Sequence, residues 1–289
     1  GPNVLVTKHS QPVASSLAKV VYGSKSADGN HLVPKAGTPK PQGDLVAMKY
    51  VKPFIGAKEL VHKTDRWCFW MAGENFAPDD IIKSPVLKQA VEACKSFREA
   101  STKKATQLSA RQPASFTEIR QFNESYIAIP RHVSETRFYW PVERFGSDVI
   151  CGDSNFMAAD PDGLQFALIS SSMFITWQRV VGGRIKSDLR FANTLTWNTF
   201  PVPILDEQTR QTIIDAGKRV LKTRDRHPER SLAEHYNPFA MDKALLKAHD
   251  ALDSEVDKAF GAPRKLTTKK QRQELLFANY AKLTEKKRQ

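Results

Sequence analysis

The chain has 289 residues, of which 40% are hydrophobic and 26% are charged. This balance excludes an intrinsically disordered chain and is enough for one large domain or two smaller ones with a substantial core. Lys and Arg outnumber Asp and Glu by 44 to 31, which gives a net charge of +13 at pH 7. Such an excess favours a polyanionic partner, most commonly nucleic acid, although a solvated basic surface explains the same number.

The cysteines and the apolar segments indicate the compartment. Cys68, Cys94 and Cys151 are far apart and have no short paired spacing, which indicates reduced thiols in a cytoplasmic protein rather than a disulfide framework or a zinc site. We find no secretory signal and no apolar run long enough to span a bilayer, so we expect no membrane partner. Because the chain begins Gly-Pro-Asn without Met, we expect it to be a fragment of a longer polypeptide.

The first part of the chain predicts turns, one buried strand and one basic helix. Gly23-Ser24-Lys25 begins a pair of tight turns, and Lys25 is a candidate phosphate contact, although a plain surface turn is favoured. Residues 66–71 predict a strand buried on both sides. Ser84-Pro85 predicts the start of an amphipathic helix that continues to Leu108. Its other face, which is either solvated or follows a DNA backbone, carries Lys88, Lys95, Arg98, Lys103 and Lys104.

The central part of the chain predicts a sheet with a packed helix. Apolar, β-branched and aromatic composition predicts strands at residues 126–130, 138–140, 149–151, 155–157 and 194–197. Between the last two of these, Asp162 caps a helix with apolar positions from Phe166 to Val180, and Gly182-Gly183 ends it.

Beyond Pro203 the pattern changes to helices alone. Apolar periodicity predicts helices around residues 213–224, 245–260 and 275–283, and Ser231 with Glu234 forms a capping box. We therefore predict an α+β fold, with a mixed sheet and packed helices over residues 1–205, followed by an all-α module over residues 206–289.

The run from Gly182 to Asn193 contains the most informative pattern. Lys186, Asp188 and Arg190 alternate with less polar residues, so in an extended strand they share one face, roughly 7 Å apart in succession. In the DNA major groove, guanine presents two acceptors and its cytosine partner presents an amino donor, and a Lys and an Asp can take one each. A surface salt bridge between Lys186 and Asp188 is the equally open alternative.

A second candidate is the polar, basic loop at residues 131–137, between two hydrophobic segments. Loops on a rigid sheet are common recognition sites. The alternative is a hairpin loop in which Glu135 and Arg137 pair only with each other.

Catalytic patterns are weak. No glycine-rich loop follows a strand in the way that cradles a nucleotide or S-adenosylmethionine. Asn237-Pro238-Phe239 partly matches a signature of amino-methylating enzymes, but an ordinary turn between helices is favoured. His249 lies in an apolar stripe, which predicts a core or interface histidine. We predict no catalytic residue and no metal ligand in this chain.

The ordered motifs resemble those of MmeI-like (type IIL) restriction–modification enzymes over nearly the whole chain. The motifs that carry the resemblance are Gly23-Ser24-Lys25, Arg66-Trp67-Cys68, Phe97-Arg98, Tyr126 to Arg131, Ser134-Glu135-x-Arg137, Trp177-x-Arg179-x-Val181, Gly183 to Asp188, Arg190-Phe191-x-Asn193, Asn198-x-Phe200-Pro201, Ser231-Leu232-Ala233-Glu234-x-Tyr236 and Ala248-His249-x-x-Leu252-Asp253.

This resemblance implies a target-recognition domain followed by a C-terminal helical region. The partners it implies are double-stranded DNA and a methyltransferase domain earlier in the same polypeptide. No cofactor is expected in this chain; S-adenosylmethionine belongs to the adenine-N6 methyltransferase, and Mg²⁺ to a nuclease if one is fused. Base-reading positions of the family align with Lys186, Asp188 and Arg190, and a further one falls near Ser154. Additional candidates for phosphate or base contacts are Arg131, Ser134, Glu135, Arg137, Arg179 and Arg184.

Two other classes of function compete with this interpretation. One is an RNA-binding or ribosome-associated module without a methyltransferase partner, which would prefer single strands over duplex. The other is an enzyme with unfamiliar motifs, which would have a complete pocket with perturbed titratable groups.

Overall fold

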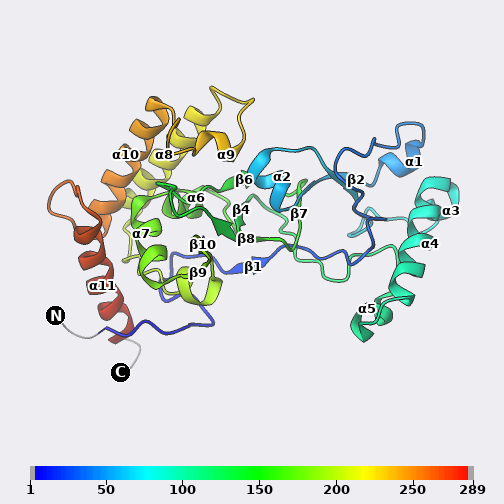
Figure 1. The fold of residues 1–289 in the computed structure, drawn as a ribbon, viewed down its shortest axis with the longest axis horizontal. Helices are drawn as coiled ribbons and strands as arrows, with labels where there is room; N and C mark the ends of the chain where they lie inside the picture. The colour runs from blue at the N-terminus through cyan, green and yellow to red at the C-terminus, as the bar shows by residue number, and fades with distance from the viewer. Residues whose placement is uncertain (1–3, 286–289) are drawn as a thin grey trace. The chain divides into compact units, whose positions relative to one another are not determined.

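The computed structural model describes residues 4–285 (Figure 1). Its contacts divide the chain into two compact units. The first unit comprises the chain up to Val21, Glu124–Arg144 and the chain from Phe156 onward, and the second comprises Tyr22–Asn123 and Phe145–Asn155. Among the described residues, no helix has the length and apolar character needed to cross a membrane.

The second unit is built on a three-stranded sheet. Its central strand β2 (Val51–Ile55) is antiparallel to β3 (Trp67–Phe69) and parallel to β7 (Ile150–Cys151). All three residues of β3 are buried, which confirms the strand predicted at residues 66–71. The helices of this unit are α1 (Leu45–Met48), α2 (Ala57–His62), α3 (Asp80–Lys83), α4 (Pro85–Glu99) and α5 (Lys104–Ser109).

Helix α4 begins as predicted, but it ends at Glu99 instead of continuing to Leu108, and its basic face is smaller than predicted. The Ser84 hydroxyl accepts a hydrogen bond from the Leu87 amide, which satisfies one of the free N–H groups of the first turn. Arg98, which was predicted on the basic face, is instead fully buried. Its guanidinium donates at 2.7–3.1 Å to the backbone carbonyls of Ser26, Ala27, Ser109, Gln112 and Ser115. A buried cation needs such partners because an unpaired one is costly, so Arg98 joins three segments of the unit.

The first unit contains most of a four-stranded sheet in the order β1 (Val20–Tyr22), β8 (Asn155–Ala159), β4 (Tyr126–Pro130), β6 (Glu143–Phe145). Every residue of β4 is buried, as expected for a strand covered on both faces. Next in the chain after β8 come α6 (Leu164–Ile169) and α7 (Ser172–Val181), where the sequence predicts one continuous helix. The break falls at Ser170 and Ser171, and Ser171 caps α7 by accepting from the Phe174 amide.

Two predicted strands are not strands. Residues 138–140 form an irregular segment in which Tyr139 and Trp140 are buried, and residues 194–197 lie in a π-helix, Asn193–Trp197. In the π-helix the Thr196 hydroxyl bonds the amide and the carbonyl of Ala192, which offers the backbone an alternative to sheet pairing. The apolar composition in both segments reflects burial and not strand geometry.

The helices beyond residue 205 are α8 (Glu207–Arg224), α9 (Leu232–His235), α10 (Lys243–Ala259) and α11 (Lys269–Glu285). The predicted capping box is confirmed, since the Ser231 hydroxyl and the Glu234 carboxylate each accept from the other's backbone amide. Helix α8 packs on α6 and α10, and α11 packs on α7. These helices therefore belong to the same compact unit as residues 156–205. The α+β class with a helical C-terminal region is as predicted.

Candidate nucleic-acid interface

A small antiparallel sheet in the first unit carries the charged residues that the sequence singles out. Its strand order is β5 (His132–Val133), β10 (Asp188–Arg190), β9 (Gly183–Ile185). Leu189 lies opposite Val133, and both side chains are buried, with 1% and 5% exposure. Successive strand residues face opposite sides, so Asp188 and Arg190 lie on the outer face, where both are exposed.

Lys186 does not lie in the strand, contrary to the prediction of one extended run. Ile185 pairs with Asp188, which leaves Lys186 and Ser187 as the turn between β9 and β10. Lys186 has a φ of +55°, in the left-handed region that favours glycine. Two-residue hairpin turns need a positive φ at their first position, so turn geometry overrides the alternation at this residue. The lysine is therefore at the tip of the hairpin, beyond the face that carries Asp188 and Arg190.

Three charged side chains of this hairpin, Lys186, Asp188 and Arg190, are not neutralised by another described residue. Over residues 4–285, no ion pair or hydrogen bond involves the side chains of Lys186, Asp188 or Arg190. The alternative of a Lys186–Asp188 salt bridge is thus not observed. The strand itself is held from behind, because the buried Gln178 amide of α7 donates to the Arg190 carbonyl at 2.8 Å. In Figure 1 the hairpin lies beside α7.

The loop at residues 131–137 is fastened to this hairpin by an ion pair. Arg184 of β9 donates to the Glu135 carboxylate at 2.6 Å and to the Ser187 carbonyl at 3.2 Å. Glu135 does not pair with Arg137, so the alternative of a self-contained hairpin loop is wrong. The Arg137 guanidinium instead donates to the Ala233 carbonyl at 2.8 Å, next to the capping box.

Arg137 and Arg179 hold backbone in place. Arg179 donates to the carbonyls of Glu135 and Arg137 at 3.0 and 2.7 Å. Partial burial lowers the pKa of both guanidinium groups, and the neighbouring Arg184 lowers that of Arg179 further. Their geometry is that of loop-positioning residues, with little surface left for a ligand.

Two other candidates of the loop, Arg131 and Ser134, are half-buried. The Arg131 guanidinium lies over the Phe156 ring at 6.0 Å, a cation–π contact that orients it at the start of the loop. The Ser134 hydroxyl lies 3.0 Å from that of Thr136.

Lys25 and Ser154 belong to the second unit, whereas the hairpin belongs to the first. The Lys25 ammonium is 3.6 Å from the Glu118 carboxylate, and the two residues also pair through their backbones. The Ser154 hydroxyl accepts from the Ala57 amide at 2.9 Å. Ser154 lines a polar cleft of about 280 Å³ together with Asp28, Lys58, Glu59, Arg66 and Asp153. Lys25 therefore has an internal partner, whereas Ser154 lies at an accessible polar surface.

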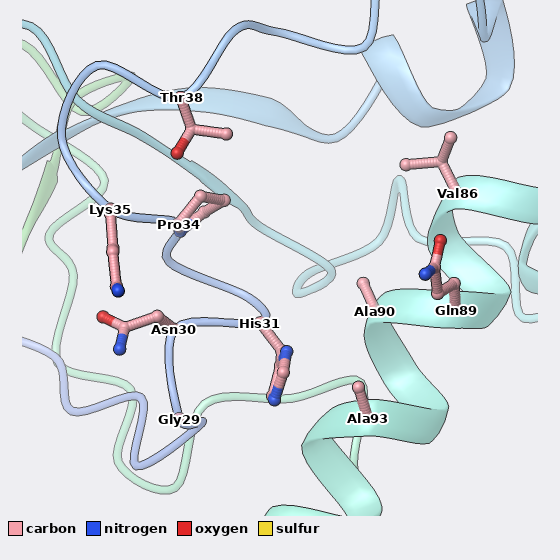
Figure 2. Close-up of a pocket in the computed structure, with 10 residues that line it drawn as sticks. All are labelled: Gly29, Asn30, His31, Pro34, Lys35, Thr38, Val86, Gln89, Ala90 and Ala93. Carbon is pink, nitrogen blue, oxygen red and sulfur yellow. The ribbon is translucent and has the colours of Figure 1, made fainter.

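Figure 2 shows a second groove of this unit, of about 520 Å³, between the loop at residues 29–38 and helix α4. Small side chains of α4, Ala90 and Ala93, form one wall. The titratable side chains on the other wall are His31 and Lys35, without a carboxylate to orient the histidine. We assign no reaction to this groove.

We examined the described residues for a metal site and for a glycine-rich loop that could hold S-adenosylmethionine. Residues 4–285 contain no group of three or more His, Cys, Asp or Glu side chains placed to hold a metal ion. The loop between β8 and α6 has a single glycine, Gly163, and no glycine-rich cradle. This loop does not fit S-adenosylmethionine.

His249 is a core histidine, as predicted. It is fully buried between Tyr139, whose ring stacks on it at 3.9 Å, and Tyr236, whose hydroxyl is 3.0 Å from Nε2. Burial lowers its pKa to about 3. Asn237-Pro238-Phe239 forms the turn that was favoured for it.

Sequence reasoning missed His132, which lies opposite Arg190 on the outer face of the small sheet. The signal was weak, because a single histidine in a basic loop does not indicate a strand position. A tight hairpin with unpaired charges on one face and an apolar seam on the other is the arrangement of a recognition domain carried on a rigid scaffold.

Comparisons with known proteins identify the family. Residues 1–204 match the family described as the target recognition domain of MmeI, and residues 205–287 match the C-terminal domain of MmeI. The chain therefore belongs to the family of MmeI target recognition and C-terminal domains.

Two relatives show the extent of this similarity. A solved structure of the type IIL restriction–modification enzyme MmeI in complex with DNA is 33% identical in sequence and has a TM-score of 0.89. The match covers 99% of this chain and 38% of that one. DNA methyltransferase A of Bacillus subtilis (strain 168) is 32% identical over 292 residues, which is 99% of this chain and 32% of that protein. The chain thus spans about a third of the length of these relatives.

Proposed function

We propose that the chain reads a short, asymmetric sequence in double-stranded DNA for an adenine-N6 DNA methyltransferase that uses S-adenosylmethionine. The observation that carries this proposal is the outer face of β10, beside the hairpin tip that carries Lys186. Asp188 and Arg190 are exposed there, and their side chains have no partner among residues 4–285. The fold similarity to MmeI, whose structure was solved in complex with DNA, supports duplex DNA as the partner. None of the reported matches supports the RNA-binding alternative.

The proposed base contacts follow from donor and acceptor chemistry. Lys186 donates to guanine O6 or N7, Asp188 accepts from the N4 amino group of the paired cytosine, and Arg190 contacts a neighbouring base. The flexible lysine stem compensates for the position of Lys186 at the tip, because a turn residue can reach over the edge of the sheet. Asp188 in the strand supplies the rigid half of the pair.

The remaining candidates take supporting roles in this proposal. Proposed contacts to phosphate or bases are Arg131, Ser134, Glu135, Arg184, Lys25 and Ser154. Arg137 and Arg179 contribute by holding the loop at residues 131–137, since their guanidinium groups are occupied by carbonyls.

We further propose that separate regions of the chain and of its parent polypeptide have separate functions. Residues 1–205 recognise the DNA sequence. Residues 206–289 support them structurally, since α8 packs on α6 and α11 packs on α7. The methyltransferase domain lies elsewhere in the same polypeptide, and S-adenosylmethionine belongs there, as does Mg²⁺ if a nuclease is fused. We propose a cytoplasmic location and a role in bacterial restriction–modification, in keeping with the three buried, unpaired thiols.

The test is a binding selection on randomised duplex DNA with the full-length polypeptide at moderate salt. We expect one short motif that contains a guanine, and a changed base at that position for the double variant K186E/D188R. Binding that depends steeply on salt but selects no motif would leave only a basic surface. If the double variant instead lost binding equally for all sequences, Lys186 and Asp188 would contact phosphate or stabilise the fold and would not read a base.

A further inference from the structure

The outer face of the small sheet contains a charged or polar residue beyond the proposed readers. His132 on β5 lies directly opposite Arg190 on β10. Residues directly opposite in an antiparallel pair point to the same face, and their Cβ atoms are about 5 Å apart. Val133 and Leu189, the next pair along, point into the core. His132 is therefore exposed on the same face as Arg190 and Asp188.

The His132 imidazole is not used inside the protein. Over residues 4–285, no hydrogen bond, ion pair or ring contact involves its side chain. The charged groups around it are Arg131, which precedes it, and Arg190 and Asp188 of β10. The outer-face residues of β9, Gly183 and Ile185, add no charge. The imidazole thus faces solvent between two cations and one carboxylate.

These surroundings keep the imidazole neutral. Partial burial, Arg131 and Arg190 lower the pKa of His132 below its usual value, and Asp188 opposes them only in part. The usual value is about 6.5, so the neutral form of the ring predominates at pH 7. A neutral imidazole has one nitrogen that donates and one that accepts. Arg190 beside it can only donate.

We propose that His132 is a base-reading residue and that it reads, together with Arg190, a second G·C pair next to the one read by Lys186 and Asp188. Arg190 donates to guanine O6 and N7, and the accepting nitrogen of His132 takes a hydrogen bond from cytosine N4. In both residue pairs a cationic side chain then donates to guanine, and the neighbouring side chain accepts from the paired cytosine. This inference rests on the proposed function.

The test compares motifs selected from randomised duplex DNA by the full-length polypeptide and by single variants at pH 7.5. We expect His132→Ala to lower discrimination about tenfold at one base pair, the same pair that Arg190→Ala affects. His132→Gln, which keeps an acceptor and a donor in an amide, retains discrimination there or shifts it toward adenine. The matched control is His62→Ala, since His62 is an exposed histidine on α2 in the second unit, and its motif is unchanged.

A second measurement uses the titration of the ring. Below its pKa, His132 loses its acceptor and becomes a third cation, so acidification from pH 7.5 through that pKa reduces discrimination at that base pair. Binding to all sequences then becomes more salt-dependent by about one charge. His132→Gln does not titrate and keeps its selectivity over the same acidification series.

The outcomes separate the inference from the proposed function. If the unaltered polypeptide selects no motif, the proposed function fails and the inference fails with it. If it selects a motif that His132→Ala leaves unchanged, or weakens equally for every sequence, the inference alone is overturned, since His132 is then a bystander or a phosphate contact.

Discussion

The carboxylate of Asp253, on α10, accepts hydrogen bonds from both the backbone amide and the hydroxyl of Ser172, the first residue of α7, at 2.7 and 2.5 Å. One helical turn earlier on α10, His249 Nδ1 lies 3.1 Å from the Ser170 carbonyl. The break between α6 and α7 is thus held at both sides by the C-terminal helices. Helix α7 in turn supports the hairpin through Gln178, so α10 contributes to the position of the proposed base-reading face.

Removal of the Asp253 carboxylate should destabilise the first unit. Asp253→Ala leaves the Ser172 amide and hydroxyl and the Tyr139 hydroxyl without this acceptor, and we expect a loss of about 2–4 kcal/mol in the free energy of unfolding. Urea denaturation followed by circular dichroism measures it. The matched control is Asp250→Ala on the same helix, where an exposed ion pair with Lys265 is worth less than about 1 kcal/mol. Equal effects of the two substitutions would contradict a special role for Asp253.

His249 should make stability depend on pH. Its pKa is lowered to about 3 in the folded protein, whereas in the unfolded chain it is about 6.5. Between these values the unfolded chain binds a proton that the folded chain does not, so the contribution of neutral His249 is complete above about pH 6.5 and is lost as the pH falls toward 3.

The comparison with His249→Gln isolates this contribution. The difference in stability between the unaltered protein and the variant should increase with pH by about 1.4 kcal/mol per pH unit between pH 4 and 6. Asp253, whose pKa burial raises to about 6, changes stability in the opposite direction over this range, but it is present in both proteins. A difference that stays constant with pH would show that His249 does not titrate as described.

Lys186→Gly should separate stability from recognition. Lysine at a φ of +55° costs about 1 kcal/mol relative to glycine, so the variant should be as stable as the unaltered protein or slightly more stable. Because the ammonium donor is lost, discrimination at the guanine should fall about tenfold or more. Thermal unfolding and the selected motif report the two effects. If Lys186→Gly selected the unaltered motif, Lys186 would not be a base-reading residue.

Arg184→Ala tests the clamp between the hairpin and the loop. The Arg184–Glu135 pair is about half exposed on both sides, so its loss should change stability by less than about 1 kcal/mol. Since Arg184 also donates to the Ser187 carbonyl in the turn, we expect weaker selectivity at the base that Lys186 is proposed to read. Glu135→Ala should resemble it, and the double variant should add little further loss. Independent, additive effects in this double-mutant cycle would show that the two side chains do not act together.

Features that depend on neighbouring residues were predictable from the sequence. The cap at Ser84, the capping box at Ser231 and Glu234 and the core position of His249 all rest on contacts or periodicity within a few residues, and each is confirmed. The motif order that resembles MmeI-like enzymes also lies in the sequence itself, and the family comparisons confirm the resemblance.

The composition of the proposed base-reading face was decided by the tertiary structure. Alternation predicts Lys186, Asp188 and Arg190 on one strand face, but the pairing of Ile185 with Asp188 places Lys186 in the turn, and the pairing with β5 adds His132. Arg98 appears basic and exposed by helical periodicity, yet carbonyls from distant segments bury it. The sequence by itself thus determined caps, burial patterns and family, because these depend on local spacing. Strand register and the partners of buried charges were decided by the tertiary structure, because they depend on which distant segments meet.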